Sequence, residues 1–152
     1  MKIIISPAKS LDFESSVPTS LHTMPRFLEQ SSKLNQKLKT LSKNKLADLM
    51  SISDDLAALN YERNQSWQPS FSPKNAKQAI FAFTGEVFRG IDINSLAVEK
   101  LPLLQENLRI LSGLYGILKP LDLMQPYRLE MGTKLRVGTK ENLYKFWVDS
   151  IA

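Results

Sequence analysis

Apolar residues along the chain follow two patterns, one typical of buried strands and one typical of helices. Short runs that are continuously apolar, instead of alternating with polar residues, indicate strands covered on both faces of a sheet. One such run is Ile3-Ile4-Ile5, and another lies in the stretch from Ala79 to Phe83. We therefore predict buried strands near residues 2–6, 79–84 and 108–112.

Apolar residues spaced three or four positions apart predict helices over much of the remaining chain. Leu34, Leu38 and Leu41 repeat in this way, and Ser42 is a residue type that caps helix N-termini. The predicted helices lie near residues 25–40, 43–50, 53–63, 95–106 and 140–151. Strands and helices together predict a mixed α/β fold with a central sheet, in one domain over residues 1–152.

The segment from 101 to 116 is compatible with two structures. Its leucines recur at a spacing that fits one continuous helix running into Gly113. A helix that enters the pair Gly113 and Gly116 would begin a helix-hairpin-helix, in which glycine amides contact DNA phosphates. The other possibility is a buried strand over residues 108–111 with a turn at 113–116, and we favour the strand.

Composition indicates a soluble globular protein and argues against several kinds of site. The chain is 43% hydrophobic and 23% charged, and it has no apolar run near the ~20 residues that a membrane helix needs. We therefore expect no membrane partner. It has no cysteine and a single histidine, His22, which leaves little for a metal cluster or a histidine-based catalytic triad. We expect no metal or other cofactor, and a cysteine-free chain agrees with a reducing cytoplasm.

Charge favours a polyanionic partner. The chain has 20 lysines and arginines against 15 acidic residues, a net charge of +5. Basic side chains that neutralise phosphates release counterions, which drives binding to nucleic acid. The alternative is a solvated surface that is simply basic. The lysines of residues 33–45 form a basic run, and such a run is more often a solvated face than a binding site.

Polar residues that follow the predicted strands are candidates for ligand contacts. In open α/β sheets, ligand crevices lie at the carboxyl ends of strands. Ser6 and Lys9 follow the first predicted strand, where they could meet a phosphate or a carboxylate. The alternative is a surface loop with a solvated lysine. The stretch from 108 to 132 has the densest combination of glycines, an aromatic residue, two arginines and a lysine.

Several motifs together resemble the YaaA (UPF0246, DUF328) family. The most specific is the block from Ser112-Gly113-Leu114-Tyr115-Gly116 to Glu130-Met131-Gly132. The N-terminal Ile5-Ser6-Pro7-Ala8-Lys9-Ser10-Leu11-Asp12 also matches, as do Trp67-Gln68-Pro69 and Tyr144-Lys145-Phe146-Trp147. The resemblance covers essentially the whole chain. Family members continue well beyond the helix that starts near Thr139, so we expect the family's C-terminal part to be missing here.

The resemblance implies a function as well as a fold. The family is bacterial and cytoplasmic, acts in peroxide stress and limits damage from intracellular iron. It is described as a mixed α/β fold with a positively charged cleft and a helix-hairpin-helix that binds duplex or distorted DNA. On this resemblance the hairpin corresponds to residues 112–116. We therefore expect a DNA-binding stress protein, and Arg109, Lys119 and Arg128 are added as phosphate partners by their charge.

An enzyme that acts on a nucleoside or nucleotide is the alternative function. Glu130 would serve as general acid or base and Arg128 would hold a phosphate, although the same residues also suit a strand with a structural Arg–Glu pair. The resemblance implies no established reaction. Direct iron binding is disfavoured because the acidic residues show no recognised ligand spacing. The candidate nucleic-acid or phosphate-binding residues are Ser6, Lys9, Arg109, Ser112, Gly113, Tyr115, Gly116, Lys119, Tyr127, Arg128 and Glu130.

Overall fold

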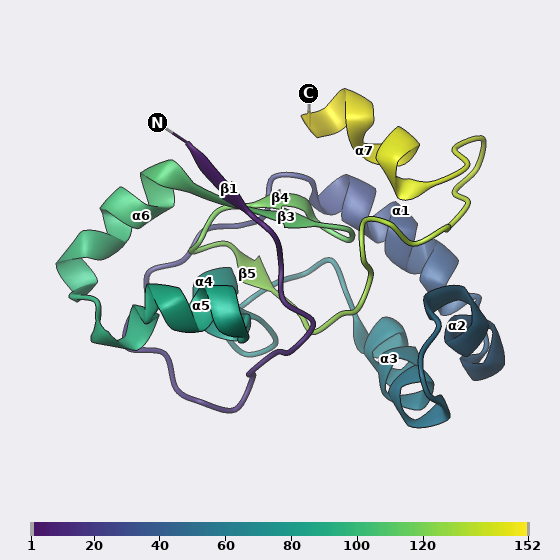
Figure 1. The fold of residues 1–152 in the computed structure, drawn as a ribbon, viewed down its shortest axis with the longest axis horizontal. Helices are drawn as coiled ribbons and strands as arrows, with labels where there is room; N and C mark the ends of the chain where they lie inside the picture. The colour runs from purple at the N-terminus through teal and green to yellow at the C-terminus, as the bar shows by residue number, and fades with distance from the viewer. Residues whose placement is uncertain (1, 152) are drawn as a thin grey trace. The chain divides into compact units, whose positions relative to one another are not determined.

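A computed structural model describes residues 2–151, except for the side chain at position 149, and divides the chain into two compact units (Figure 1). The first, which we call the sheet unit, contains residues 2–26, 70–111 and 117–126. The second, the helical unit, contains residues 27–69, 112–116 and 127–151. Each unit is thus assembled from segments that are distant in sequence.

The sheet unit is organised around two small sheets. In the larger sheet, β1 (Ile3–Ile5) lies parallel to β3 (Leu108–Ser112), and β4 (Gly116–Leu118) follows β3 in the order β1-β3-β4. In the smaller sheet, β2 (Lys77–Gln78) pairs antiparallel with β5 (Leu123–Met124). The remaining elements of the unit are α4 (Ala79–Ala82), α5 (Glu86–Ile91), the 3-10 turns η1 (Ile93–Ser95) and η2 (Val98–Lys100), and α6 (Leu101–Asn107). The mixed α/β class predicted from the sequence is confirmed.

The predicted strand near 79–84 is wrong, because this segment forms the short helix α4. All four residues of α4 are buried, and the amide of Phe83 closes the helical turn by donating to the carbonyl of Ala79. The amides of Ala79 and Ile80 donate to the carbonyls of Asp122 and Pro120. A short, fully buried apolar run has the same pattern in a strand and in a helix, so periodicity could not separate the two.

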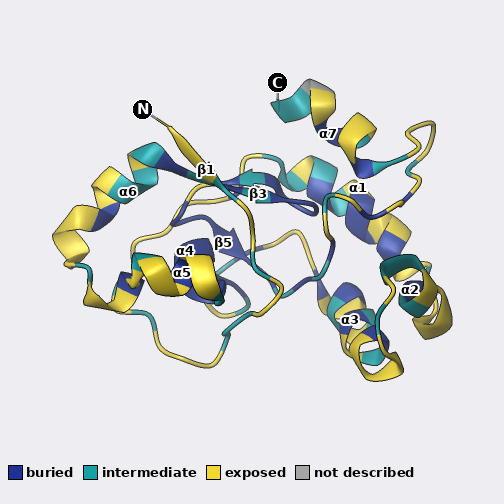
Figure 2. Cartoon of the chain, in the orientation of Figure 1, coloured by how far each residue is buried: buried dark blue, intermediate teal, exposed yellow. Residues whose placement is uncertain are grey.

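The strand near residues 2–6 exists as β1, but the prediction that it is buried on both faces is wrong. Ile3 is 50% exposed and Ile4 is 61% exposed. Within the described residues β1 pairs only with β3, so it lies at an edge of its sheet (Figure 2). The apolar run identified the strand correctly, while its place in the sheet determined the exposure.

The prediction of a strand at 108–112 is confirmed, and the helical alternative is wrong. Helix α6 ends at Asn107, and Leu108 already has the extended backbone of β3. Three residues join β3 to β4, its neighbour in the sheet, so the segment is a strand-turn-strand hairpin. The helix predicted near 95–106 begins later than expected, at Leu101, after the two 3-10 turns. Pro102 lies in its first turn, where a missing amide proton costs nothing.

The helical unit contains the helices predicted near 25–40, 43–50, 53–63 and 140–151. They are α1 (Leu28–Lys39), α2 (Lys43–Met50), α3 (Asp54–Ser66) and α7 (Leu143–Ile151). The hydroxyls of Ser42 and Ser53 cap α2 and α3 by accepting amide protons from Lys45 and Leu56. Both α1 and α2 pack on α3, and each of the three helices has buried residues (Figure 2). Leu34, Leu38, Leu46 and Ala57 are among them. The described part of the chain has no helix with the length and apolar character needed to cross a bilayer.

Candidate functional site

Five of the predicted site residues meet in the helical unit, in a buried cluster of hydroxyl groups and aromatic rings. They are Ser112, Gly113, Tyr115, Gly116 and Tyr127. The hydroxyls of Ser112 and Tyr127 share a 2.7 Å hydrogen bond, and the Ser112 hydroxyl also accepts the amide proton of Tyr115 at 3.1 Å. The two tyrosine rings meet edge to face with centroids 5.2 Å apart. Tyr115 is 0% exposed.

Two tryptophans close this cluster. The indole N–H of Trp67 donates to the Tyr115 hydroxyl at 3.0 Å, and that of Trp147 donates to the Gly113 carbonyl at 2.8 Å. A Cβ at Gly113 would lie 2.0 Å from the Leu129 carbonyl oxygen, and one at Gly116 would lie 2.8 Å from the Trp147 ring. Gly116 also has a φ of +78°, which favours glycine. Both glycines therefore make room for buried neighbours of the same unit.

Burial determines the chemistry of the tyrosines. Loss of water raises the pKa of the Tyr127 phenol well above its usual value, and the hydrogen bond with Ser112 only partly opposes this. Tyr127 is therefore a neutral phenol at physiological pH. Residues 112–116 are all buried in the described structure, so a phosphate in solution would reach them only if the cluster opened.

Arg128 and Glu130 lie at the edge of the helical unit, half-buried and exposed, respectively. The pKa of Arg63, near the end of α3, is lowered first by burial and then by the positive charge of Arg128. The Arg63 guanidinium donates to Asn60 Oδ1 at 3.3 Å. Adjacent guanidinium groups are a common way to bind phosphate or carboxylate. Arg63 could not be predicted from the sequence, because its proximity to Arg128 arises only in the fold.

The other predicted residues belong to the sheet unit. Ser6 and Lys9 are exposed after β1, as expected for residues at a strand end. Arg109 is half-buried and donates to the carbonyls of Gln105 and Leu108 at 2.7 Å, so it covers the C-terminal end of α6. Lys119 is exposed after β4. No described contact joins these four residues into one site within the unit.

The buried carboxyl of Asp122 is influenced by the charges of Arg109 and Lys119. It accepts hydrogen bonds from the Thr23 hydroxyl and from the Lys119 amide. Burial raises the pKa of Asp122, while those hydrogen bonds and the two cations lower it. Arg109 and Lys119 therefore already act on a carboxyl of their own unit.

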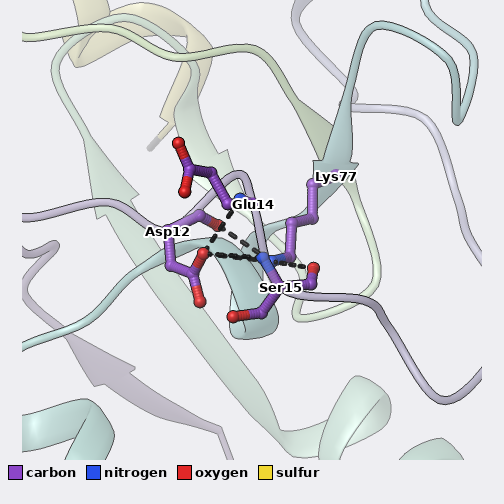
Figure 3. Close-up of polar contacts among 4 residues, drawn as sticks. All are labelled: Asp12, Glu14, Ser15 and Lys77. Atoms are coloured by element: carbon purple, nitrogen blue, oxygen red, sulfur yellow. Dashed lines mark hydrogen bonds and ion pairs between the residues drawn. The ribbon is translucent and has the colours of Figure 1, made fainter.

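A cluster that sequence reasoning missed lies in the sheet unit, between the loop after β1 and strand β2 (Figure 3). The ammonium group of Lys77 donates to the carbonyl oxygens of Asp12 and Ser15, both at 2.9 Å, and lies 3.9 Å from the Asp12 carboxylate. Asp12 Oδ1 accepts the amide protons of Glu14 and Ser15 at 2.9 and 3.0 Å. The side chain of Lys77 is only 8% exposed.

Hydrogen bonds, burial and charge shift the pKa values of Asp12 and Lys77. Hydrogen bonds from Ser15 and Glu14 keep the pKa of Asp12 well below its usual value. Burial lowers the pKa of Lys77, and the Asp12 carboxylate opposes that shift. An aspartate that accepts amide protons two and three residues ahead is a recognisable turn signal. Lys77 had no such signal, because 65 positions separate it from Asp12.

A pocket of about 590 Å³ lies beside this cluster, also within the sheet unit. Residues 13, 15–17, 19 and 20 line one part of it, and residues 73–78 and Pro126 line the rest. Its volume lies within the range of roughly 300–1,000 Å³ that is typical of small-molecule sites. The lining combines hydroxyl, amide and lysine side chains with several apolar groups, and it contains no carboxylate.

The lysines of the basic run at 33–45 are all exposed on the helical unit, and we call this set of five residues the lysine surface. It consists of Lys33, Lys37 and Lys39 on α1 and Lys43 and Lys45 on α2. None of the five forms an ion pair with a described residue, although Lys43 lies 5.5 Å from the centroid of the Tyr61 ring. Among the side chains that the structure describes, no group of three histidine, cysteine or acidic residues could hold a metal ion.

Comparison with known proteins places these features in a family context. The family model described as "Peroxide stress protein YaaA" matches residues 1–152. A UPF0246 protein of Flavobacterium johnsoniae is 55% identical over 151 residues, which are 99% of this chain and 60% of that relative. A UPF0246 protein of Hahella chejuensis is 54% identical over 151 residues, or 99% of this chain and 59% of the relative. The chain thus spans about 60% of the length of these curated relatives.

Proposed function

The chain belongs to the peroxide stress protein YaaA family, and from that premise we propose that it acts in the bacterial response to peroxide stress by binding DNA. Bound protein would shield duplex or distorted DNA from oxidative and iron-dependent damage. Because the chain spans about 60% of its relatives, this proposal concerns the contacts that residues 2–151 can make.

The lysine surface is the observation that supports this proposal. Its five ammonium groups are exposed and form no ion pair with a described residue, so no ion pair must be broken when they meet phosphates. Each neutralised phosphate releases condensed counterions from DNA. Lysine contacts to the backbone recognise the shape and charge of DNA, and carry little sequence information.

The start of α2 strengthens the argument. Lys43 and Lys45 lie in its first turn, at the positive end of the helix dipole, and no acidic residue accompanies them there. Cations are unfavourable at this end of a helix. A DNA phosphate beside Ser42 and the two lysines would remove that repulsion.

DNA contact by the hairpin at 112–116 finds less support than contact by the lysine surface. The hairpin consists of strands and a turn, and its residues are buried with their polar groups paired inside the unit. The alternative of a nucleotide enzyme is not supported by Tyr115, because its hydroxyl accepts the Trp67 proton in a fully buried position. We assign the principal phosphate contacts to the lysine surface, and Arg63 with Arg128 would add an anion contact on the same unit.

The test measures binding of the protein to a duplex and to the same duplex with a central bulge, by fluorescence anisotropy. If about four phosphates are contacted, the association constant should fall about a hundredfold between about 50 and 200 mM salt. The triple variant Lys37→Glu, Lys39→Glu and Lys43→Glu should bind at least about tenfold more weakly at the lower salt.

The matched control carries the same change in charge elsewhere: Lys100→Glu, Lys134→Glu and Lys140→Glu, all at exposed positions. It should retain most of the affinity. Affinity that is independent of salt would refute DNA binding through phosphates, and an equal loss in both triple variants would refute the lysine surface as the contact.

A further inference from the structure

The pocket of the sheet unit is held open by side chains that fasten both of its walls. On one wall, Lys77 holds the carbonyls of Asp12 and Ser15 (Figure 3), and Gln78 Nε2 donates to the Leu21 carbonyl at 2.8 Å. The loop between these anchors therefore has both ends fixed to β2. On the other wall, Asn75 accepts the Ser72 amide proton and donates to the Ser70 carbonyl. A site formed in advance loses less entropy when a ligand binds.

The charge of the lining favours an anion. Lys74 and Lys77 both line the pocket, and no acidic residue does. Lys77 is fully engaged by the loop, but the ammonium group of Lys74 is exposed and pairs with no described residue. The hydroxyls of Ser16 and Ser20 also line the pocket and make no hydrogen bond to a described group, so they can donate to an anion beside Lys74.

A second polar side chain, Gln78, lines the same pocket. Gln78 is only 5% exposed and lines the pocket, and its Nε2 is used by Leu21. Its Oε1 accepts no hydrogen bond from a described residue. An amide oxygen that no described donor uses can accept an N–H or O–H from a ligand in the pocket. Phe13, Val17 and Pro126 also line the pocket and supply apolar surface on which a flat ring can pack.

From this arrangement we propose that the pocket of the sheet unit binds a nucleoside monophosphate. The phosphate lies against Lys74 and the hydroxyls of Ser16 and Ser20, the base packs on Phe13, and an N–H of the base donates to Gln78 Oε1. This site uses residues of the sheet unit only, so it is independent of DNA binding by the lysine surface.

The experiment titrates the whole chain with the monophosphates of adenosine, guanosine, cytidine and uridine, with adenosine, and with inorganic phosphate, by isothermal titration calorimetry. We expect at least one nucleotide to saturate the protein and to bind at least about tenfold more tightly than adenosine or phosphate alone, since a charge-assisted contact and base packing then act together. The absence of saturable nucleotide binding would overturn the proposal. Equal affinity for nucleotide and inorganic phosphate would overturn it too, because Lys74 would then act without the pocket.

Two variants test the place of binding. Lys74→Glu should weaken nucleotide binding at least about tenfold and leave adenosine binding nearly unchanged, whereas Lys100→Glu, the same charge change at an exposed position outside the lining, should alter neither. Ser16→Trp fills the pocket from an exposed loop position and should abolish both. A folded Ser16→Trp protein that still binds the nucleotide would place it elsewhere. If these two variants lose nucleotide binding and still bind DNA, the nucleotide site is independent of DNA binding by the lysine surface.

Discussion

A polar cluster of the helical unit and a polar cluster of the sheet unit differ in charge. In the helical unit the cluster of Ser112, Tyr115 and Tyr127 is neutral and sealed by tryptophans. In the sheet unit the cluster of Asp12 and Lys77 is charged and lies at the edge of a pocket. A neutral hydroxyl can be buried with one or two partners, while a buried ammonium needs several strong acceptors.

This difference shows which residues are free to take part in function. The polar groups of the neutral cluster form hydrogen bonds with one another. The segment at 112–116, which has many candidate ligand-binding residues, is therefore part of the buried core. The charged cluster fixes a loop and leaves the adjacent Lys74, Ser16 and Gln78 Oε1 open to a ligand. A fixed loop beside open polar groups is what a binding site requires.

The largest effect should come from breaking the neutral cluster with Gly113→Ala. Its methyl group would meet the Leu129 carbonyl, a backbone atom that cannot move alone. We expect the free energy of unfolding to fall by about 3 kcal/mol, the upper end for overpacking. Urea unfolding measures it, and Gly132→Ala is the control, because nothing lies within 4 Å of a Cβ there. Equal stability of the two variants would show that Gly113 is not packed as described.

A smaller loss should follow when the charged cluster is broken by Lys77→Met. This change keeps the buried aliphatic chain and removes the ammonium, so the carbonyls of Asp12 and Ser15 lose their shared donor. We expect a loss of about 1–3 kcal/mol in the free energy of unfolding. Hydrogen exchange at the amides of Glu14 and Ser15 should accelerate as well. Lys74→Met, at an exposed position three residues earlier, should change neither quantity, and a similar effect in both would contradict the role of Lys77.

The smallest expected effect is a change with pH in the stability that Asp12 contributes. The native pKa of Asp12 lies below its ordinary value of 3.8, so its contribution to stability is present above that value and is lost as the pH falls through the native pKa. Asp12→Asn should therefore be less stable than the unmodified protein at neutral pH, and the gap should narrow below 3.8. Unfolding free energies across this pH range measure the gap. Ser15 and Glu14 cause the shift by hydrogen bonding, so a gap that widens in acid would contradict their role.

Local signals predicted much of the fold. The serine caps of α2 and α3 satisfy amides within their own turn, so they could be recognised without the rest of the chain. The β-branched run at the start became β1, and the end of α6 at Asn107 left residues 108–112 as a strand. The strand predicted near 79–84 is wrong, because a buried run of four apolar residues fits a strand and a helix equally well.

The candidate site was less predictable than the fold. Motif density identified Ser112, Tyr115 and Tyr127 as a group, and they do meet in the structure, but inside the helical unit. Burial depends on what packs around a residue, and Trp67 and Trp147 come from other parts of the sequence. The sequence shows the lysines of residues 33–45 as a basic run. That they are exposed and form no ion pair with a described residue is known only from the fold.

The sequence by itself determined the family, the mixed α/β class, the capped helices and the basic charge of this protein. These follow from local geometry, from composition and from motifs that are read one segment at a time. Tertiary structure alone decided that Gly113 and Gly116 face buried neighbours, that β1 is exposed, and that Lys77 reaches a loop 65 positions away. The physical reason is that burial and ion pairing are set by contacts between distant segments, and a linear pattern does not contain them.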